Sequence, residues 1–197
     1  MDREQIELWD DEAARFDDDP DHGLRDPDVR AAWRDLLTRL LPSPPARVAD
    51  LGCGTGTLSV LLAGEGYAVD GIDFSTEMVR RAIAKAAGRD RVTVAVGDAS
   101  DPPLDAAAYD VVLCRHVLWA MPDPAAALAR WRELLRPGGR LVLIEGSWST
   151  GAGLAADKTV AAVETNGLRA QLTMLDDPLY WGRETDDERY VVVARPE

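Results

Sequence analysis

A short glycine-rich turn after an apolar run constrains this chain more than any other feature. Residues 48–56 read Val-Ala-Asp-Leu-Gly-Cys-Gly-Thr-Gly, which predicts a buried strand, a tight turn and then a helix. Gly52, Gly54 and Gly56 carry no Cβ, so the backbone can turn sharply and approach a ligand closely. A dinucleotide fingerprint would need glycine or alanine at position 57, where this chain has threonine. Asp50, just before the turn, disfavours a pyrophosphate and suits a cationic or amino-bearing ligand.

The pattern after residue 46 alternates between strands and helices, which predicts an α/β fold with helices covering a mostly parallel sheet. The expected strands are 47–51, 68–72, 92–96, 109–114, 139–145, 170–175 and 189–195. The expected helices are 2–17 and 28–41 before the sheet, then 56–64, 76–87, 124–135 and 153–165. The connection 176–188 is too short for a crossover helix, so the last two strands should form an antiparallel hairpin at the sheet's edge.

Composition narrows the range of partners. The 197 residues are 46% hydrophobic, which suits one domain with a sizeable core. The net charge is −13, and the only lysines are Lys85 and Lys158, so no nucleic-acid substrate is expected. Twelve acidic residues fall within residues 1–28. They form either a solvated face or an electrostatic attraction for a cationic or amine substrate.

No apolar stretch is long enough for a signal peptide or a membrane span, so the cytoplasm is the expected location and no membrane partner is expected. Cys53 and Cys114 lie in apolar contexts without a C-x-x-C motif, and no histidine stands at ligand spacing. We therefore expect buried free thiols and no metal site.

The glycine turn and the order of elements resemble motif I and the layout of class I S-adenosylmethionine-dependent methyltransferases, in particular the methyltransferase type 11 and ubiquinone-biosynthesis-type groups. The resemblance covers residues 47–197 and implies a Rossmann-like, seven-stranded core domain with an antiparallel last strand. It also implies that residues 1–46 form an N-terminal helical cap over the carboxyl ends of the strands. Little extra sequence lies between the fifth and seventh strands. Substrate recognition should therefore come from the cap, the loop after residue 145 and the connection 176–188.

An acidic residue ends the second strand as well as the first. Asp73 follows Asp50 by 23 positions, a separation at which a carboxylate commonly accepts hydrogen bonds from ribose hydroxyls. The alternative role, capping the helix that follows, is better served by Ser75. We therefore expect Asp73 to bind ribose.

The third strand ends in Asp98 and Ala99, and the resemblance implies that they bind the adenine amine and a ring nitrogen; a surface turn is the alternative. Phe74 would lie against the adenine, and Met78 packs either on its other face or in the core. The implied cofactor-binding residues are Asp50, Gly52, Cys53, Gly54, Gly56, Asp73, Phe74, Met78, Asp98, Ala99 and Arg115.

Residues 109–119 resemble motif IV of the same family, which borders the transferable methyl group. Arg115 and His116 stand just past the expected strand, where ligands bind in open α/β sheets. His116 is the candidate catalytic residue, as a base for the nucleophile; the alternative is packing beneath the cap. Arg115 would bind a carboxylate of substrate or cofactor, or pair with Asp98 or Asp123.

Other residues are candidates for the substrate pocket. Glu145 would border it, although solvent exposure is favoured, and His22 would reach it only if the cap closes. Most of the six tryptophans should pack in the core or cap, and some would line an apolar pocket or lie against a sulfonium. The candidates for lining the substrate pocket are Trp9, Phe16, His22, Trp33, Trp119, Glu145, Trp148 and Trp181.

The sequence thus predicts a methyltransferase that uses S-adenosylmethionine, releases S-adenosylhomocysteine and transfers the methyl group to a small molecule by in-line displacement. The acceptor atom would be oxygen, nitrogen or carbon. The rival interpretations are a peptide or protein methyltransferase, a non-catalytic cofactor-binding module and, more distantly, a nicotinamide oxidoreductase. The expected assembly is a monomer or a homodimer.

Overall fold

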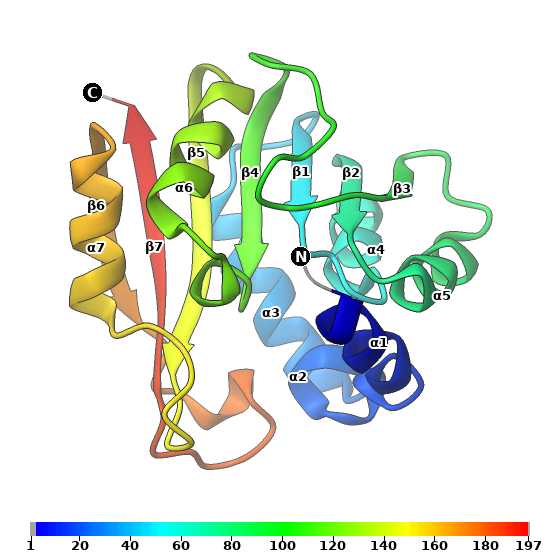
Figure 1. Ribbon diagram of the computed structural model, residues 1–197. Helices are drawn as coiled ribbons and strands as arrows, with labels where there is room; N and C mark the ends of the chain where they lie inside the picture. Colours follow the sequence, from blue (N-terminus) through cyan, green and yellow to red (C-terminus); the bar gives the residue numbers. More distant parts are fainter. Residues whose placement is uncertain (1–2, 197) are drawn as a thin grey trace.

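Seven strands, seven α-helices and three short 3-10 helices lie within residues 3–196, the part of the chain that the computed structural model describes (Figure 1). The strands are β1 (Arg47–Leu51), β2 (Ala68–Asp73), β3 (Val92–Val96), β4 (Tyr109–Arg115), β5 (Leu135–Ser147), β6 (Leu168–Met174) and β7 (Glu188–Pro196). The helices are α1 (Arg3–Glu12), α2 (Pro20–Gly23), α3 (Pro27–Leu40), α4 (Thr57–Gly64), α5 (Thr76–Ala86), α6 (Pro124–Leu134) and α7 (Ala156–Thr165). Every expected element is present. The first helix ends earlier than predicted, and β5 begins four residues earlier than position 139.

The strands form one sheet in the order β3-β2-β1-β4-β5-β7-β6. Strands β1 to β5 pair in parallel, whereas β7 lies antiparallel to both β5 and β6. This confirms the Rossmann-like sheet with an antiparallel last strand. The chain leaves β1 toward β2 on one side and later enters β4 on the other, so the strand order reverses between β1 and β4. Ligands of open α/β sheets bind at such a switch point, outside the carboxyl ends of the strands.

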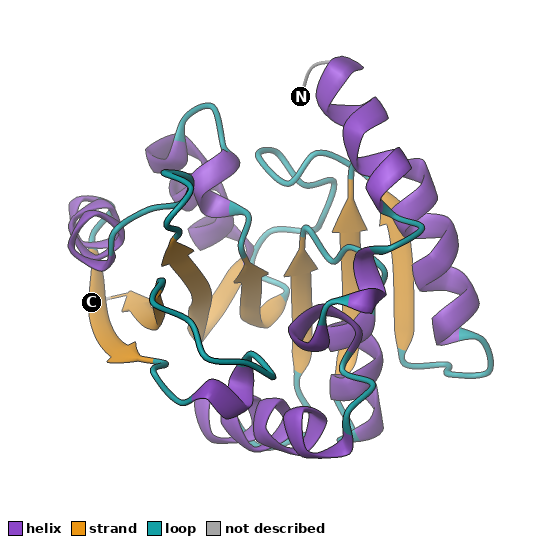
Figure 2. Ribbon diagram, turned by 90° about the horizontal axis from the view of Figure 1, so that it is seen from below, coloured by secondary structure: helices purple, strands orange, loops and turns teal. Residues whose placement is uncertain are grey.

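Alternating side chains of the strands build a hydrophobic core on each face of the sheet. Val48, Val111 and Val142 pack in the cluster that contains α3 and α4. Their neighbours Ala49 and Val112 point the other way, into the cluster that contains α6 and α7. Figure 2 shows these helices above and below the strands. The sheet is therefore covered on both faces, and its carboxyl edge is left for a site.

The segment before the sheet divides into two parts. Helices α1 and α2 lie near the carboxyl ends of β1 and β2 (Figure 1), whereas α3 packs on a face of the sheet with Trp33 fully buried. Helix α1 is held to α5 through Asp10, which accepts hydrogen bonds from Ser75 Oγ (2.5 Å) and the Glu77 backbone N–H (3.1 Å). We call residues 3–23 the cap from here on.

No helix among the described residues is both long and apolar enough to cross a membrane.

Candidate active site

The glycine turn after β1 adopts backbone angles that only glycine tolerates without strain. Gly52 has φ +69°, and a Cβ at this position would lie 2.3 Å from Cγ2 of Val117. Gly54 has φ +54°, and a Cβ there would press on the Phe16 ring of the cap at 3.1 Å. The turn is thus packed between the segment that follows β4 and the cap, and any larger residue would push them apart.

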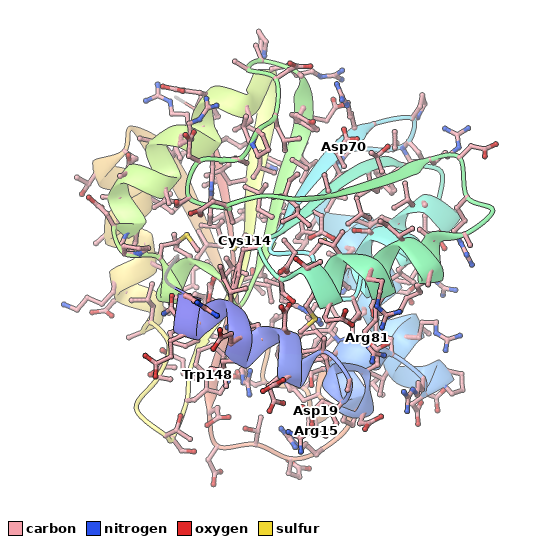
Figure 3. The ribbon with its side chains drawn as sticks, turned by 45° about the vertical axis from the view of Figure 1, so that its right-hand side comes forward. Arg15, Asp19, Asp70, Arg81, Cys114 and Trp148 are labelled. Carbon is pink, nitrogen blue, oxygen red and sulfur yellow. The ribbon has the colours of Figure 1, made fainter. Side chains whose placement is uncertain are left out.

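A cavity of about 470 Å³ opens beside this turn, at the carboxyl edge of the sheet. Its volume falls within the ~300–1,000 Å³ usual for small-molecule sites. The glycine turn and the end of β2 line one side, and the cap, the loop after β5 and the connection to β7 line the rest. Figure 3 shows Trp148 and Asp19, from two of these lining segments, at the same edge of the molecule.

Most of the predicted site residues line this cavity. From the predicted cofactor set these are Asp50, Gly52, Cys53, Gly54, Asp73, Phe74, Met78, Ala99 and Arg115. The candidate base His116 and the substrate candidates Trp9, Phe16, His22, Trp119 and Trp148 also line it. Residues 115 to 119 and the cap, far apart in the sequence, are thereby brought together.

Five predicted residues lie outside the lining. Gly56 caps α4 with φ +76°, and Asp98 accepts hydrogen bonds from the backbone and side chain of Ser100 (2.8 and 2.7 Å). Trp33 and Trp181 are buried and donate their indole N–H groups to the Tyr180 and Leu175 carbonyls (2.7 and 2.9 Å). The two tryptophans contact each other edge to face and support the cavity from behind.

The fifth, Glu145, is fully buried, so its expected solvent exposure is wrong. Its Oε1 accepts hydrogen bonds from the backbone N–H groups of Val117 (3.1 Å) and Leu118 (2.8 Å). Burial raises the pKa of Glu145 to about 8. The side chain lies beneath the turn that follows β4 and fixes its backbone, because those N–H groups need an acceptor.

Asp73 has the geometry expected of a ribose-binding carboxylate. It is 7% exposed, and its two oxygens accept hydrogen bonds from the backbone N–H groups of Gly54 (2.8 Å) and Ser75 (2.9 Å). A carboxylate has about four lone-pair positions, so it retains acceptor capacity toward the cavity. Ser75 caps α5 by accepting from the Met78 N–H (3.1 Å), as predicted. Asp73 is therefore not needed as the cap.

Asp50 lies at the end of β1 and is 3% exposed. Ser59 donates its hydroxyl to this carboxylate at 2.5 Å. Burial raises the pKa of Asp50 to about 6, despite the hydrogen bond from Ser59 and the nearby charge of Arg115. A cationic group bound in the cavity would offset this desolvation and favour the ionised form.

The cysteines are both free thiols, as expected. Cys114 is buried, whereas Cys53 is partly exposed and lines the cavity. Burial, together with nearby carboxylates, raises the pKa of each thiol well above its usual value. Neither is therefore poised as a nucleophile.

His116 occupies a strained position at the end of β4, with φ +58°. Its ring stacks on Trp181 (centroids 6.1 Å apart) and meets Trp148 edge-on (5.1 Å). Burial lowers the pKa of His116 well below its usual value, and the charges of Arg115 and Arg189 lower it further. The imidazole is therefore neutral at physiological pH.

The preceding residue, Arg115, turns toward the cap. Its guanidinium donates to the Asp21 carbonyl (2.5 Å) and lies 5.1 Å from the Trp33 ring. It thus uses a backbone carbonyl of α2, rather than Asp98 or Asp123, as its hydrogen-bond acceptor. His22, one residue further along α2, stacks on Phe16 with ring centroids 4.3 Å apart. Strand β4 and the cap therefore meet where Arg115 binds the Asp21 carbonyl.

Arg189, at the start of β7, was not predicted from the sequence. It is 6% exposed, and its guanidinium lies 5.1 Å from the Trp148 ring and 4.8 Å from the Trp181 ring. Asp187, two residues earlier in the chain, accepts a hydrogen bond from Arg189 Nη2 at 3.0 Å. Arg189, Asp187 and the exposed Arg183 all line the cavity. No motif marked them, because Arg183 and Asp187 lie in an irregular connection and Arg189 begins an edge hairpin.

The antiparallel β7, the glycine turn after β1 and the acidic end of β2 define an α/β domain of the class I methyltransferase type. Residues 49–143 match the family model described as "Methyltransferase domain".

Several curated proteins resemble the chain. Nocamycin O-methyltransferase of Saccharothrix syringae is 40% identical over 119 residues, which cover 58% of this chain and 42% of that protein. Trans-aconitate 2-methyltransferase of Streptomyces avermitilis is 39% identical over 131 residues, covering 62% and 48%. Demethylmenaquinone methyltransferase of Clavibacter sepedonicus is 38% identical over 116 residues, covering 58% and 47%. The chain spans less than half the length of these relatives.

Solved structures share the fold. The [4+2]-cyclase SpnF superposes with a TM-score of 0.74 at 20% identity, covering 84% of this chain and 80% of that one. A putative methyltransferase solved with the Haloferax volcanii Trm112 activator has a TM-score of 0.74 at 22% identity, covering 96% and 98%. Magnesium protoporphyrin IX methyltransferase of Synechocystis, with bound S-adenosylhomocysteine, has a TM-score of 0.68 at 22% identity, covering 85% and 82%. At such identities the similarity shows the fold alone.

Proposed function

We propose that this protein is a methyltransferase that uses S-adenosylmethionine to methylate a small molecule. The observation that carries the proposal is the position of Asp73. Its carboxylate is held by the glycine turn itself, through Gly54, and faces the cavity with acceptor capacity left for a diol. The family match over residues 49–143 supports the same conclusion.

The residues around the glycine turn fit the cofactor. Asp73 would hold the ribose, Phe74 and Met78 would contact the adenine, and Asp50 would lie near the cationic methionine portion. When bound, S-adenosylmethionine supplies an electrophilic methyl group, which a nucleophile can take while the bonding electrons remain on the leaving sulfur. Gly52 and Gly54 carry no Cβ and line the cavity, so their backbone can come close to the ligand.

The chain's own contribution is to orient the acceptor and exclude water. The cap closes one side of the cavity, and Trp119 and Trp148 form an apolar wall on the other, with ring centroids 5.6 Å apart. His116 faces the same wall as a neutral imidazole. We propose that it contacts the acceptor and, because its basicity is low, assists only the deprotonation of an acidic acceptor.

The cavity favours a small acceptor over a peptide or protein. It lies between the cap and the loop after β5, and it is lined from several segments rather than open along one groove. The [4+2]-cyclase SpnF shares the fold, so an activity other than methyl transfer is the alternative. A non-catalytic cofactor-binding role is another.

Calorimetric titration with S-adenosylhomocysteine, with NADH as the control ligand, tests the cofactor. One-to-one micromolar binding of the first ligand alone is the expected result. Binding of NADH, or of neither ligand by folded, ligand-free protein, would overturn the proposal. Incubation with labelled methyl donor and a panel of small acceptors then separates an enzyme from a binding module, which would bind S-adenosylhomocysteine and transfer no label.

A further inference from the structure

The part of the cavity wall around His116 holds two guanidinium groups, although the protein as a whole is acidic. The charged or titratable groups that act on His116 are Arg115, Arg189 and His22. All three oppose its protonation. The Asp21 carboxylate lies on the cap side of the imidazole, within 4.8 Å of one of its ring nitrogens. A molecule with a net charge of −13 has thus placed two guanidinium groups, the buried Arg189 and the half-buried Arg115, beside one imidazole.

These groups have unused hydrogen-bonding capacity. His116 Nε2 and Arg189 Nε are buried and have no hydrogen-bond partner among the described residues. Arg189 has five N–H donors in all, and Asp187 accepts from one nitrogen, Nη2. Asp187 also accepts from the Ser149 N–H (2.8 Å) and is therefore occupied in holding the loop after β5. Buried polar groups in folded proteins are nearly always paired, so orphaned donors beside a cavity point to a missing acceptor.

The tryptophans determine what can reach these donors. Arg189 lies between the rings of Trp148 and Trp181, which fix its guanidinium in one orientation. Trp148 also contacts Trp119, and both line the cavity. A ligand that accepts hydrogen bonds from Arg189 would thus meet a fixed cation and an aromatic surface together. This arrangement suits a ligand with a planar, apolar body and an anionic group.

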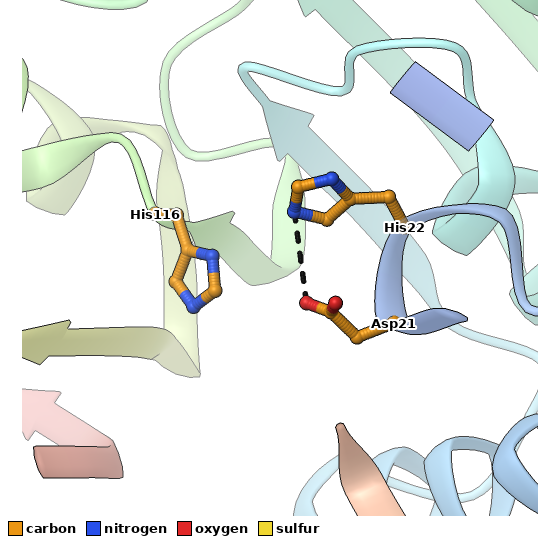
Figure 4. A group of neighbouring side chains, drawn as sticks. All are labelled: Asp21, His22 and His116. Carbon is orange, nitrogen blue, oxygen red and sulfur yellow. Dashed lines mark ion pairs between the residues drawn. The ribbon is translucent and has the colours of Figure 1, made fainter. Parts of the chain in front are cut away.

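A metal ion is the competing occupant. Ligand atoms of Asp21, His22 and His116 lie within 4.8 Å of one another (Figure 4), and two imidazoles with a carboxylate suit several transition metals. However, Arg115 lowers the pKa of both histidines, and Arg189 does so too. A divalent cation at the same place would meet the same repulsion. Asp21 and Asp19 act in the opposite direction on His22, so the cap side of the cluster would accept a cation. The unpaired Nε of Arg189 lies on the other side of the cavity wall and can only donate, so that side favours an anion.

We propose that the methyl acceptor is a carboxylic acid with an apolar or aromatic body, and that its carboxylate binds against Arg189 and His116. That the bound acid is methylated rests on the proposed methyltransferase function. Binding of the acid at this site can be tested separately. It also replaces the amine substrate suggested by the acidic N-terminal residues. Several of those acids have structural partners, among them Asp10, Asp17 and Asp26.

The test compares acids with their uncharged counterparts. We would titrate para-hydroxybenzoate and trans-aconitate, each paired with its amide, into the full chain with and without saturating S-adenosylhomocysteine. We expect both acids to bind more tightly than their amides by about tenfold or more, as for hydrogen bonds to a charged group. Arg189→Gln should abolish this preference and leave the affinity for S-adenosylhomocysteine unchanged.

Arg195→Gln is the matched control, because Arg195 lies on the same strand as Arg189 but at its other end, away from the cavity. Equal binding of acids and amides to the wild-type protein, or a preference that survives Arg189→Gln, would overturn the proposal. Failure of both acids to bind would overturn it as well. The comparison of acids with amides uses the wild-type protein, so it does not depend on whether a variant folds. If the wild-type protein binds Co²⁺ and His22→Ala does not, the cluster of Asp21, His22 and His116 is a metal site instead. Acid binding without S-adenosylhomocysteine binding would reject the methyltransferase function and keep the acid site.

Discussion

The Asp17 carboxylate lies 2.8 Å from the Lys85 ammonium and ties the cap to α5 across the glycine turn. Thr55, within that turn, donates its hydroxyl to Asp17 (2.5 Å) and accepts from Lys85 (2.9 Å). Both charged side chains are 27% exposed. Partial burial raises the pKa of Asp17, but the hydrogen bonds from Lys85 and Thr55 outweigh it, so the pKa is lowered overall.

Asp17→Asn should loosen the cap, because it removes one charge from this partly buried pair. We expect a loss of about 1 kcal/mol in unfolding free energy and faster amide exchange within residues 3–23. Asp18→Asn is the control: its ion pair with Arg25 has side chains that are 63% and 70% exposed. Equal effects of the two variants in hydrogen exchange would show that the cap does not depend on Asp17.

Asp73→Asn should weaken binding of S-adenosylhomocysteine by about 1–3 kcal/mol, because a neutral amide replaces the carboxylate that accepts from the ribose. Asparagine keeps one oxygen to accept from a backbone N–H, so the turn is disturbed less than by alanine. Asp70→Asn, on the same strand, removes the ion pair with Arg47 (2.8 Å) and should leave this affinity unchanged. Calorimetry gives both values, and wild-type affinity in folded Asp73→Asn would refute the ribose assignment.

Binding of S-adenosylhomocysteine should depend on the ionisation of Asp50, whose pKa burial raises to about 6. A cationic amino group near Asp50 favours the carboxylate, so binding releases a proton wherever the free protein is protonated. Affinity should therefore fall by up to about tenfold for each pH unit below 6 and level off above it. Calorimetry across this range should show a much flatter profile for Asp50→Asn. Identical profiles would place the amino group elsewhere.

Glu145→Gln should change how stability depends on pH. Burial raises the pKa of Glu145 from 4.5 in the unfolded chain to about 8 in the folded protein. Its contribution to stability is therefore fully present below pH 4.5 and is lost as the pH rises through about 8. Glutamine keeps the oxygen that accepts from Val117 and Leu118 and does not titrate.

Relative to wild type, Glu145→Gln should thus gain on the order of a few kcal/mol between these two pH values, as measured by denaturant unfolding. The exposed Glu164→Gln serves as the control and should show no such gain. A constant difference between wild type and Glu145→Gln at all pH values would contradict the protonated, buried state.

His116→Asn should reduce turnover by about a hundredfold, because it removes the imidazole that faces the acceptor. Asparagine is preferable to alanine here, since it tolerates the φ of +58°. The affinity for S-adenosylhomocysteine should stay within about twofold of wild type, which separates loss of the acceptor contact from loss of the cofactor. Full activity of this variant would make His116 a packing residue.

The strands and most helices could be predicted because each is a run of apolar or amphipathic residues ended by glycine or proline. The start of β5 was missed for the same reason. Residues 137–139 read Pro-Gly-Gly and indicated a turn, but the strand begins earlier, where Leu135 pairs with Tyr109. Pairing with a neighbouring strand is a long-range contact that no local signal contains.

The half of the cavity beside the glycine turn was predictable because its residues stand at strand ends, as Asp50 and Asp73 do. The other half was not. Arg189 begins an edge hairpin without a motif, and its role depends on Trp148 and Trp181, which lie 41 and eight residues away. The burial of Glu145 was missed since its partners, Val117 and Leu118, offer backbone groups that no side-chain pattern reveals.

The left-handed residue at the end of β4 has a consequence for how such a site can diversify. The kink at His116 sends two adjacent side chains to different tasks: Arg115 reaches the cap, and His116 reaches the tryptophan wall. A replacement at position 116 that rejects this backbone angle would also displace Arg115 and disturb the cap. Drift at this position is thereby confined to the few residue types that accept a positive φ. New acceptor preferences would therefore arise more readily in the loops flanking Trp148 and Arg183, which can change without moving the sheet.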